Sequence, residues 1–315
     1  MKMTLRSCSI TACTVAALML SAQGASSAPS SPVGSECETT PTAVTAQAAQ
    51  VSAVSSAVMP RNRRVFPGKI LVAYYGTAHT GALGVLGEAP PREMTRRLRA
   101  AARPFKTNNK KVQIVYELIV SVADAAPGAD GDYSHLIPRS YVREYVRAAR
   151  RKRALLVMDF QPGRSTFLSQ VKQFSWALEK PFVGVALDPE WRMGPGEVPA
   201  QTIGSVGAKE VNRVSRYVAR LTRNQGLKQK LFMLHQFRTD MIRHIAKVQT
   251  RPALATVQHV DGFGSQSQKL ATYHGVARPK KFHLGFKLFY DEDTDLFRPR
   301  EVRRIKPNVK FISYQ

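Results

Sequence analysis

Short apolar runs alternate with longer amphipathic stretches from residue 69 to the end of the chain. The runs are rich in β-branched and aromatic residues, which is typical of strands. They are Lys69–Tyr75, Val112–Ile119, Ala154–Phe160, Phe182–Leu187, Lys230–Gln236, Ala253–Val260, Phe282–Tyr290 and Val309–Tyr314. Between most runs, apolar residues recur at helical spacing. In residues 139–153, for example, Val142, Tyr145 and Ala149 make one face and arginines line another.

Eight strands that alternate with helices over about 250 residues predict an α/β fold, a (β/α)8 TIM-type barrel. An open doubly wound sheet is the alternative, but no GxGxxG turn follows the first run. The run Val309–Tyr314 is followed only by Gln315, so the final helix is missing or the outer ring is completed otherwise. The phosphate site that such barrels build after strands seven and eight then cannot form in its usual way.

Composition divides the chain into three parts. Residues 1–24 resemble an export signal, with Lys2 and Arg6 before an apolar core and Ala22-Gln23-Gly24 as a cleavage site. Residues 25–60 are rich in Ser, Ala, Thr and Pro and predict a disordered linker. Residues 61–315 form the barrel domain. The apolar core is too short for a membrane span, so we expect a secreted or cell-surface protein without stable membrane insertion.

The net charge narrows the choice of partners. Removing Lys2 and Arg6 with the signal lowers the formal charge from +25 to +23. Such a surface would attract a polysaccharide or an anionic cell-wall polymer. Nucleic acid is not expected, because of the export signal and because no RNA-binding patch of arginine, glycine and aromatic residues occurs. Cys37 is the one cysteine outside the signal, so no internal disulfide or cysteine metal site is expected.

Polar residues stand at the ends of the runs, where a parallel barrel collects its functional groups. In chain order they are Tyr74 and Tyr75, Glu117, Asp159 and Gln161, Asp188 with Glu190 and Trp191, His235 and Gln236, Gln258 and Asp261, Tyr290 and Asp291, and Tyr314. A polar residue after a strand is also a normal start of a loop. However, acids stand at five of the eight ends, in a chain with 47 basic and only 22 acidic residues. The repetition predicts an acidic cup in a basic protein.

Carbohydrate chemistry offers a reason for such a cup. Glycosidic cleavage passes through an oxocarbenium-like state, which needs a carboxylic acid to protonate the leaving oxygen and a carboxylate opposite. Neighbouring acids raise one another's pKa, and this keeps one of them protonated near neutral pH. Tyrosine and tryptophan side chains beside these acids would stack on the apolar faces of sugar rings.

The segment DPEW at residues 188–191 resembles the Asp-x-Glu ending of barrel glycoside hydrolases of the chitinase and cell-wall muramidase types. In those families the Glu is the general acid, and the preceding Asp supports it or the acetamido group of the substrate. The resemblance implies Glu190 as the acid and Asp188 as its helper. It covers only the fourth run and the barrel plan, and it departs at Val183 and Ala186, where chitinases carry further acids. The chain is also similar to exported barrel proteins of high-GC Gram-positive bacteria, which implies no activity.

These observations predict a secreted glycoside hydrolase that cleaves a cell-wall or environmental polysaccharide. The expected catalytic residues are Glu190, Asp188 and Asp159, and the expected substrate-binding residues are Tyr75, Glu117, Trp191, Gln236, Asp261 and Asp291. The alternative is a barrel without catalysis that binds glycan or associates with the cell wall by its charge. No cofactor is expected. A metal site from several aspartates and His235 has no HxH, HExxH or DxD spacing to support it, and His235 is as consistent with a core histidine.

Overall fold

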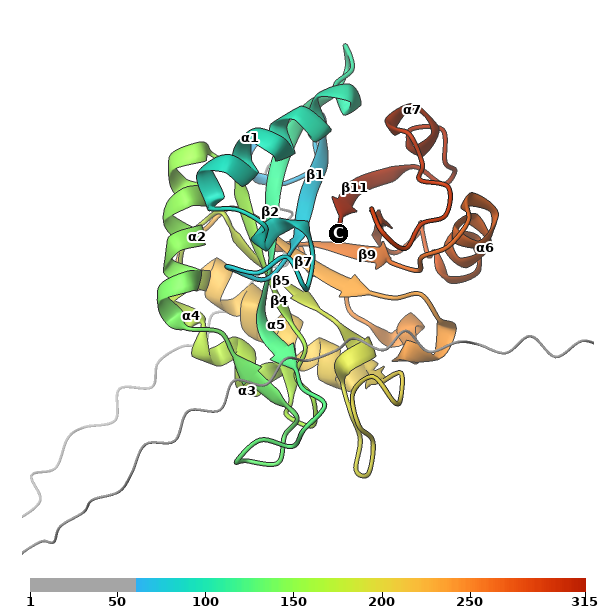
Figure 1. Cartoon of the computed structure of the whole chain (residues 1–315). Helices are drawn as coiled ribbons and strands as arrows, with labels where there is room; N and C mark the ends of the chain where they lie inside the picture. The colour runs from blue at the N-terminus through green and yellow to red at the C-terminus, as the bar shows by residue number, and fades with distance from the viewer. Residues whose placement is uncertain (1–60) are drawn as a thin grey trace, which may run out of the picture. The chain divides into compact units, whose positions relative to one another are not determined.

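A computed structural model describes residues 61–315, which form a closed barrel of eight parallel strands (Figure 1). The barrel strands are β1 (Lys69–Gly76), β2 (Lys111–Ala123), β4 (Leu155–Phe160), β5 (Val183–Leu187), β7 (Lys230–His235), β9 (Leu254–Val260), β10 (His283–Leu288) and β11 (Val309–Tyr314). They follow one another around the ring in this order, and β1 closes it by pairing with both β11 and β2. The TIM-type barrel is therefore confirmed, with a strand at each of the eight predicted runs. The expected signal and linker lie outside the described residues.

Helices join most of the barrel strands and cover the outside of the ring (Figure 1). They are α1 (Pro91–Ala102), α2 (Arg139–Lys152), α3 (Phe167–Gln173), α4 (Ser175–Leu178), α5 (Ala208–Asn224), α6 (Gln266–Val276) and α7 (Pro299–Val302). The connection from β7 to β9 holds only short 3-10 turns and β8 (Ile242–Arg243), which pairs with β6 (Val206–Gly207). Strand β3 (Ser134–Leu136) pairs antiparallel with β2. In residues 61–315 no helix follows β11, so the helical ring is less complete than the strand ring.

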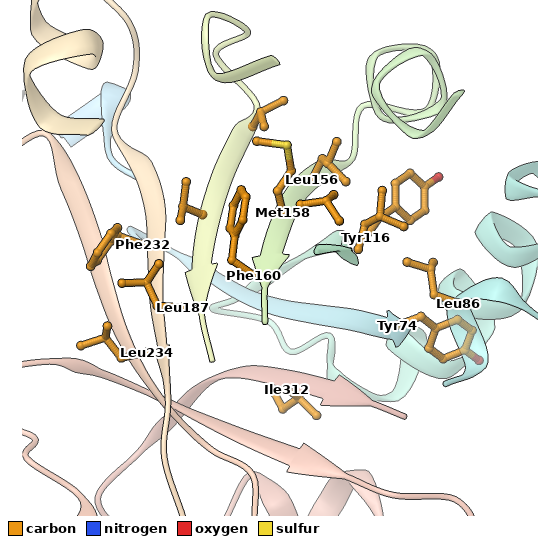
Figure 2. Close-up of a cluster of buried hydrophobic side chains, with 14 of the residues drawn as sticks. Tyr74, Leu86, Tyr116, Leu156, Met158, Phe160, Leu187, Phe232, Leu234 and Ile312 are labelled. Carbon is orange, nitrogen blue, oxygen red and sulfur yellow. The ribbon is translucent and has the colours of Figure 1, made fainter. Parts of the chain in front are cut away.

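Alternate residues of each strand pack into two separate apolar layers, because successive side chains of a strand point to opposite faces. In β4, Leu156, Met158 and Phe160 face outwards into the larger core between strands and helices, part of which Figure 2 shows. Val157, between them, belongs to a smaller apolar cluster inside the barrel together with Phe311 and other inward residues. The alternation of side chains along each strand thus separates the residues that pack against the helices from those that fill the barrel.

Helix α2 shows how an arginine-rich segment is held on the barrel. Val142 and Tyr145 are buried on its inner face, as the helical spacing predicts. On its outer side, the guanidinium carbons of Arg139 and Arg143 lie 4.7 and 5.6 Å from the ring centroid of Trp176, within cation–π range. Some of the surface arginines are therefore ordered by contacts with the fold. Within residues 61–315, no helix is both long enough and apolar enough to cross a membrane.

Candidate active site

The inner face of the barrel changes from apolar to polar towards the carboxyl ends of the strands. Each barrel strand places at least one inward polar residue in its middle or later part, or directly after it, following the alternation of the strand. These eight residues are Tyr75, Glu117, Asp159, Asp188, His235, His259, Lys287 and Ser313, and together they are the polar ring. None of them exposes more than 4% of its surface, so they interact with one another rather than with bulk water.

His235, the last residue of β7, lies between carboxylates. Its Nδ1 is 2.8 Å from Oδ2 of Asp261, and its Nε2 is 3.2 Å from Oε1 of Glu117 and 3.8 Å from Oδ1 of Asp159. Burial by itself lowers the pKa of His235, but the charge of Asp159 and the contacts with Asp261 and Glu117 outweigh this effect. The pKa of His235 is therefore raised well above its ordinary value.

Asp159 lies beside a buried tyrosine and lysine. The hydroxyl of Tyr75 donates to Oδ2 of Asp159 at 2.8 Å, and Nζ of Lys287 lies 3.5 Å from the centroid of the Tyr75 ring. Burial raises the pKa of Asp159 to about 6, with the positive charge of His235 opposing this and the charge of Glu117 adding to it. Asp159 is thus held in a network of strands β1, β4 and β10, below the mouth of the barrel.

Glu190 stands nearer to solvent than the polar ring, in the 3-10 turn Pro189–Trp191 that follows β5. The side chain of Asp188 caps this turn by accepting from the N–H of Glu190 at 3.3 Å. Burial raises the pKa of Glu190 to about 7; the charge of Asp261 adds to the effect, while Lys287 and His235 oppose it. Burial also raises the pKa of Asp188 well above its usual range, against the charge of His235. The two acids interact, but across a turn and not along a strand.

The structure brings six of the nine predicted site residues together: Tyr75, Glu117, Asp159, Asp188, Glu190 and Asp261. Gln236 is different, because it follows the inward His235 and turns to the outer side. There its Oε1 accepts from Gln258 at 2.7 Å and its Nε2 donates to the carbonyl of Arg238. Asp291 is exposed in the turn after β10, and Trp191 is half-buried in the turn that holds Glu190.

Three members of the polar ring were missed by the sequence reasoning: His259, Lys287 and Ser313. Each lies one residue before the end of its strand, as Tyr75 and Asp159 do. The alternation itself carries the signal. In β10, Leu284, Phe286 and Leu288 face the outer core, which leaves Lys287 on the inward face.

One group of histidines and carboxylates within residues 61–315 is compact enough to hold a metal ion. One ligand atom from each of Glu117, His235 and His259 lies within 4.8 Å of the others, and all three residues are buried. Within the described residues, no other set of three or more histidine, cysteine, aspartate or glutamate side chains is this compact.

No family model matches this sequence, and no curated protein matches it. Among solved structures, it is similar to a candidate alpha-L-fucosidase from Bacteroides thetaiotaomicron VPI-5482, at 7% identity and a TM-score of 0.40, over 80% of this chain and 89% of that one. It is also similar to 3-keto-D-glucoside 4-epimerase, YcjR, from E. coli, at 9% identity and a TM-score of 0.37, over 78% and 91% of the two chains. The barrel assignment rests on the closed strand order and not on these likenesses.

Proposed function

We propose that this chain is a secreted glycoside hydrolase that acts on a cell-wall or environmental polysaccharide. Glu190 is its general acid. The observation that carries the proposal is that Glu190 is partly exposed at the mouth of the barrel and has a pKa of about 7. A carboxyl group with this pKa is partly protonated at neutral pH, which is what protonation of a glycosidic oxygen requires.

Carboxylates near Glu190 support the remaining steps. The charge of Asp261 acts on Glu190 more strongly than any other charge, so we assign Asp261 as the carboxylate that stabilises the positive sugar or accepts a proton from water. Asp188 positions the backbone of Glu190 through the cap of the turn. Asp159 and Glu117 have no exposed surface, so we assign them to the electrostatics beneath this pair and not to contact with the glycan.

The distribution of exposed apolar side chains is consistent with sugar binding at the same face. The large hydrophobic residues exposed within residues 61–315 are Ile203, Phe263 and Tyr290, and they follow β5, β9 and β10. All three therefore lie on the loops at the carboxyl ends of strands, around Glu190 and Asp261. Phe263 is 62% exposed, and an exposed ring beside acids suits stacking on a sugar. The positive exterior would favour anionic wall polymers.

The test is hydrolysis by the purified full chain of chromogenic glycosides and of isolated cell-wall polymers, measured as released chromophore or new reducing ends. We expect turnover by the wild type and its near-complete loss in Glu190→Gln, because an amide cannot donate the proton. Glu179→Gln, on an exposed residue after α4, is the matched control and should retain activity.

Full activity of the Glu190→Gln variant would remove Glu190 from this role. A wild type that binds these polymers but hydrolyses none of them would support the alternative, a glycan-binding barrel without catalysis. That alternative has its own support in the complete burial of Glu117 and Asp159.

A further inference from the structure

Several buried polar atoms of the polar ring have no hydrogen-bond partner within residues 61–315. They are both carboxylate oxygens of Glu117, Oδ1 of Asp159, Nε2 of His235 and Nδ1 of His259. Nε2 of His235 does lie within ion-pair distance of Glu117 and Asp159. Leaving a buried polar atom unpaired is costly, so native proteins pair most such atoms. Five such atoms on four residues, from strands β2, β4, β7 and β9, indicate that something besides protein atoms completes this part of the barrel.

Three of the residues that carry these atoms have the chemistry and spacing of metal ligands. Glu117 on β2, His235 on β7 and His259 on β9 each offer one ligand atom within 4.8 Å of the other two. Ligands of a tetrahedral ion with bonds of about 2.0–2.1 Å lie roughly 3.4 Å apart. Nε2 of His235 and Oε1 of Glu117, 3.2 Å apart, already have this spacing. The three residues come from rigid strands far apart in sequence, so no short motif announces them.

In each histidine one ring nitrogen is held by a neighbouring side chain, which leaves the other nitrogen to bind a metal, as is usual for metal-binding histidines. Asp261 lies 2.8 Å from Nδ1 of His235, which leaves Nε2 turned towards Glu117. Nε2 of His259 lies 2.7 Å from Oγ of Ser313. Gly285 makes room for the His259 ring, because a Cβ at this position would overlap Nδ1. These contacts fix the imidazoles before any ligand binds.

The excess of buried carboxyl groups in the barrel interior also favours binding of a cation. Glu117, Asp159, Asp188 and Asp261 are buried carboxyl groups. The buried positive groups around them are Lys287, Lys269, which pairs with Asp293 at 2.9 Å, and, when protonated, His235. Buried carboxylates in excess of cations must be neutralised by protons or by a bound ion. A divalent ion at the unpaired atoms would balance the excess where it is concentrated.

We propose that Glu117, His235 and His259 bind a divalent transition-metal ion such as Zn²⁺. Two imidazole nitrogens with one carboxylate favour such an ion over Mg²⁺ or Ca²⁺, which prefer all-oxygen ligands. Three protein ligands leave a coordination position open, and Oδ1 of Asp159 lies 3.8 Å from Nε2 of His235 beside it. The metal site goes beyond the proposed glycoside hydrolysis and does not depend on it.

The test measures metal binding directly. The full chain is treated with a chelator, its thiols are blocked so that cysteine cannot bind zinc, and it is titrated with Zn²⁺ in competition with a chromophoric zinc indicator. We expect one equivalent to bind and the melting temperature to rise with Zn²⁺ concentration, since a ligand that binds only the folded state stabilises it. The same titration with Mg²⁺ should show no competition for bound Zn²⁺.

Variants locate the ion. Glu117→Gln and His259→Gln should each weaken Zn²⁺ binding by at least about 100-fold, because even the loss of a supporting contact costs 10–100-fold. His283→Gln is the control. It removes a partly buried imidazole at the amino end of β10, whereas the proposed site lies towards the carboxyl ends of the barrel strands. If a variant does not fold, the stoichiometry and the thermal shift of the wild type still decide the question. Wild-type protein that binds no Zn²⁺, or folded variants that bind it as the wild type does, would overturn the site.

Discussion

Nδ1 of His235 and Oδ2 of Asp261 lie 2.8 Å apart inside the barrel, and both side chains are buried. His235 ends β7 and Asp261 directly follows β9, so the pair joins two adjacent strands at their carboxyl ends. A carboxylate can only accept, so Nδ1 of His235 carries the proton in this contact. The orientation of the ring, and with it the position of Nε2 near Glu117, depends on Asp261.

Asp261→Ala should therefore destabilise the protein strongly. The substitution leaves the buried N–H at Nδ1 of His235 without an acceptor, so we expect the free energy of unfolding to fall by about 1–3 kcal/mol. Asp261→Asn keeps an oxygen that can accept from Nδ1 and should lose less. Urea denaturation of the two variants measures the difference. Equal, small losses would mean that the contact contributes little to the fold.

The pKa of Glu190 predicts the pH dependence of turnover. Its value of about 7 is raised by burial and by Asp261. A general acid is active when protonated, so kcat should decrease as the pH rises through about 7. In Asp261→Asn, which loses the carboxylate assigned to catalysis, the pKa of Glu190 measured by NMR titration of its carboxyl group should be lower than in the wild type, because a charge that raises it is removed. A pH–rate profile with no alkaline limb between pH 6 and 9, on any substrate that is hydrolysed, would contradict the assignment.

Phe263 is expected to bind glycan and to contribute little to folding. The residue is 62% exposed, and its ring lies 5.9 Å, centroid to centroid, from the ring of Phe289. Phe263→Ala should weaken oligosaccharide binding by about 1 kcal/mol or more, roughly the scale of an aromatic contact, with little change in melting temperature. Isothermal titration and a thermal melt separate the two effects. A lower melting temperature with unchanged affinity would identify the ring as part of the core.

Gly285 should not tolerate a side chain. Because a Cβ there would overlap the His259 ring, Gly285→Ala should lower the free energy of unfolding by about 1–3 kcal/mol, the usual cost of overpacking. Gly275→Ala is the matched control: no atom lies within 4 Å of its added Cβ, and it sits in α6. It should raise stability by about 0.5–1 kcal/mol through helix propensity. Similar effects of the two substitutions would show that His259 has room to move.

Lys230 predicts a change of stability with pH away from the active-site end. Its Nζ donates to the carbonyls of Lys180 and Val183, and burial lowers its pKa to about 7. The unfolded chain therefore binds more protons between this pKa and the ordinary value. Stability should rise with pH from about 7 to about 10.5, by at most about 1.4 kcal/mol per pH unit. Lys230→Gln should flatten this rise when urea unfolding is followed against pH. An identical slope in the variant would rule out the lysine as its source.

Much of the architecture follows from local pattern. Alternating strands and amphipathic helices are encoded within short segments, so all eight barrel strands were predicted within a few residues. The acids at their ends were also visible, because a parallel barrel turns every carboxyl end to one side. That rule placed Glu117, Asp159, Asp188 and Asp261 in one candidate site before any contact was known. It did not show that Glu190 sits in a 3-10 turn, since Pro189 ends the alternation.

The sequence did not determine which face of each strand points into the barrel. Only closure of the strand ring decides this. A period of two says that neighbours in a strand point to opposite sides, but not which side is the interior. His235 and Gln236 were both plausible from sequence; closure turned His235 inwards and Gln236 out to Gln258. The same choice brought Lys287 and His259 into the barrel. Sequence determined which residues can form a strand, while pairing of β1 with β11 determined which side chains meet, because opposite walls become neighbours only when the sheet closes.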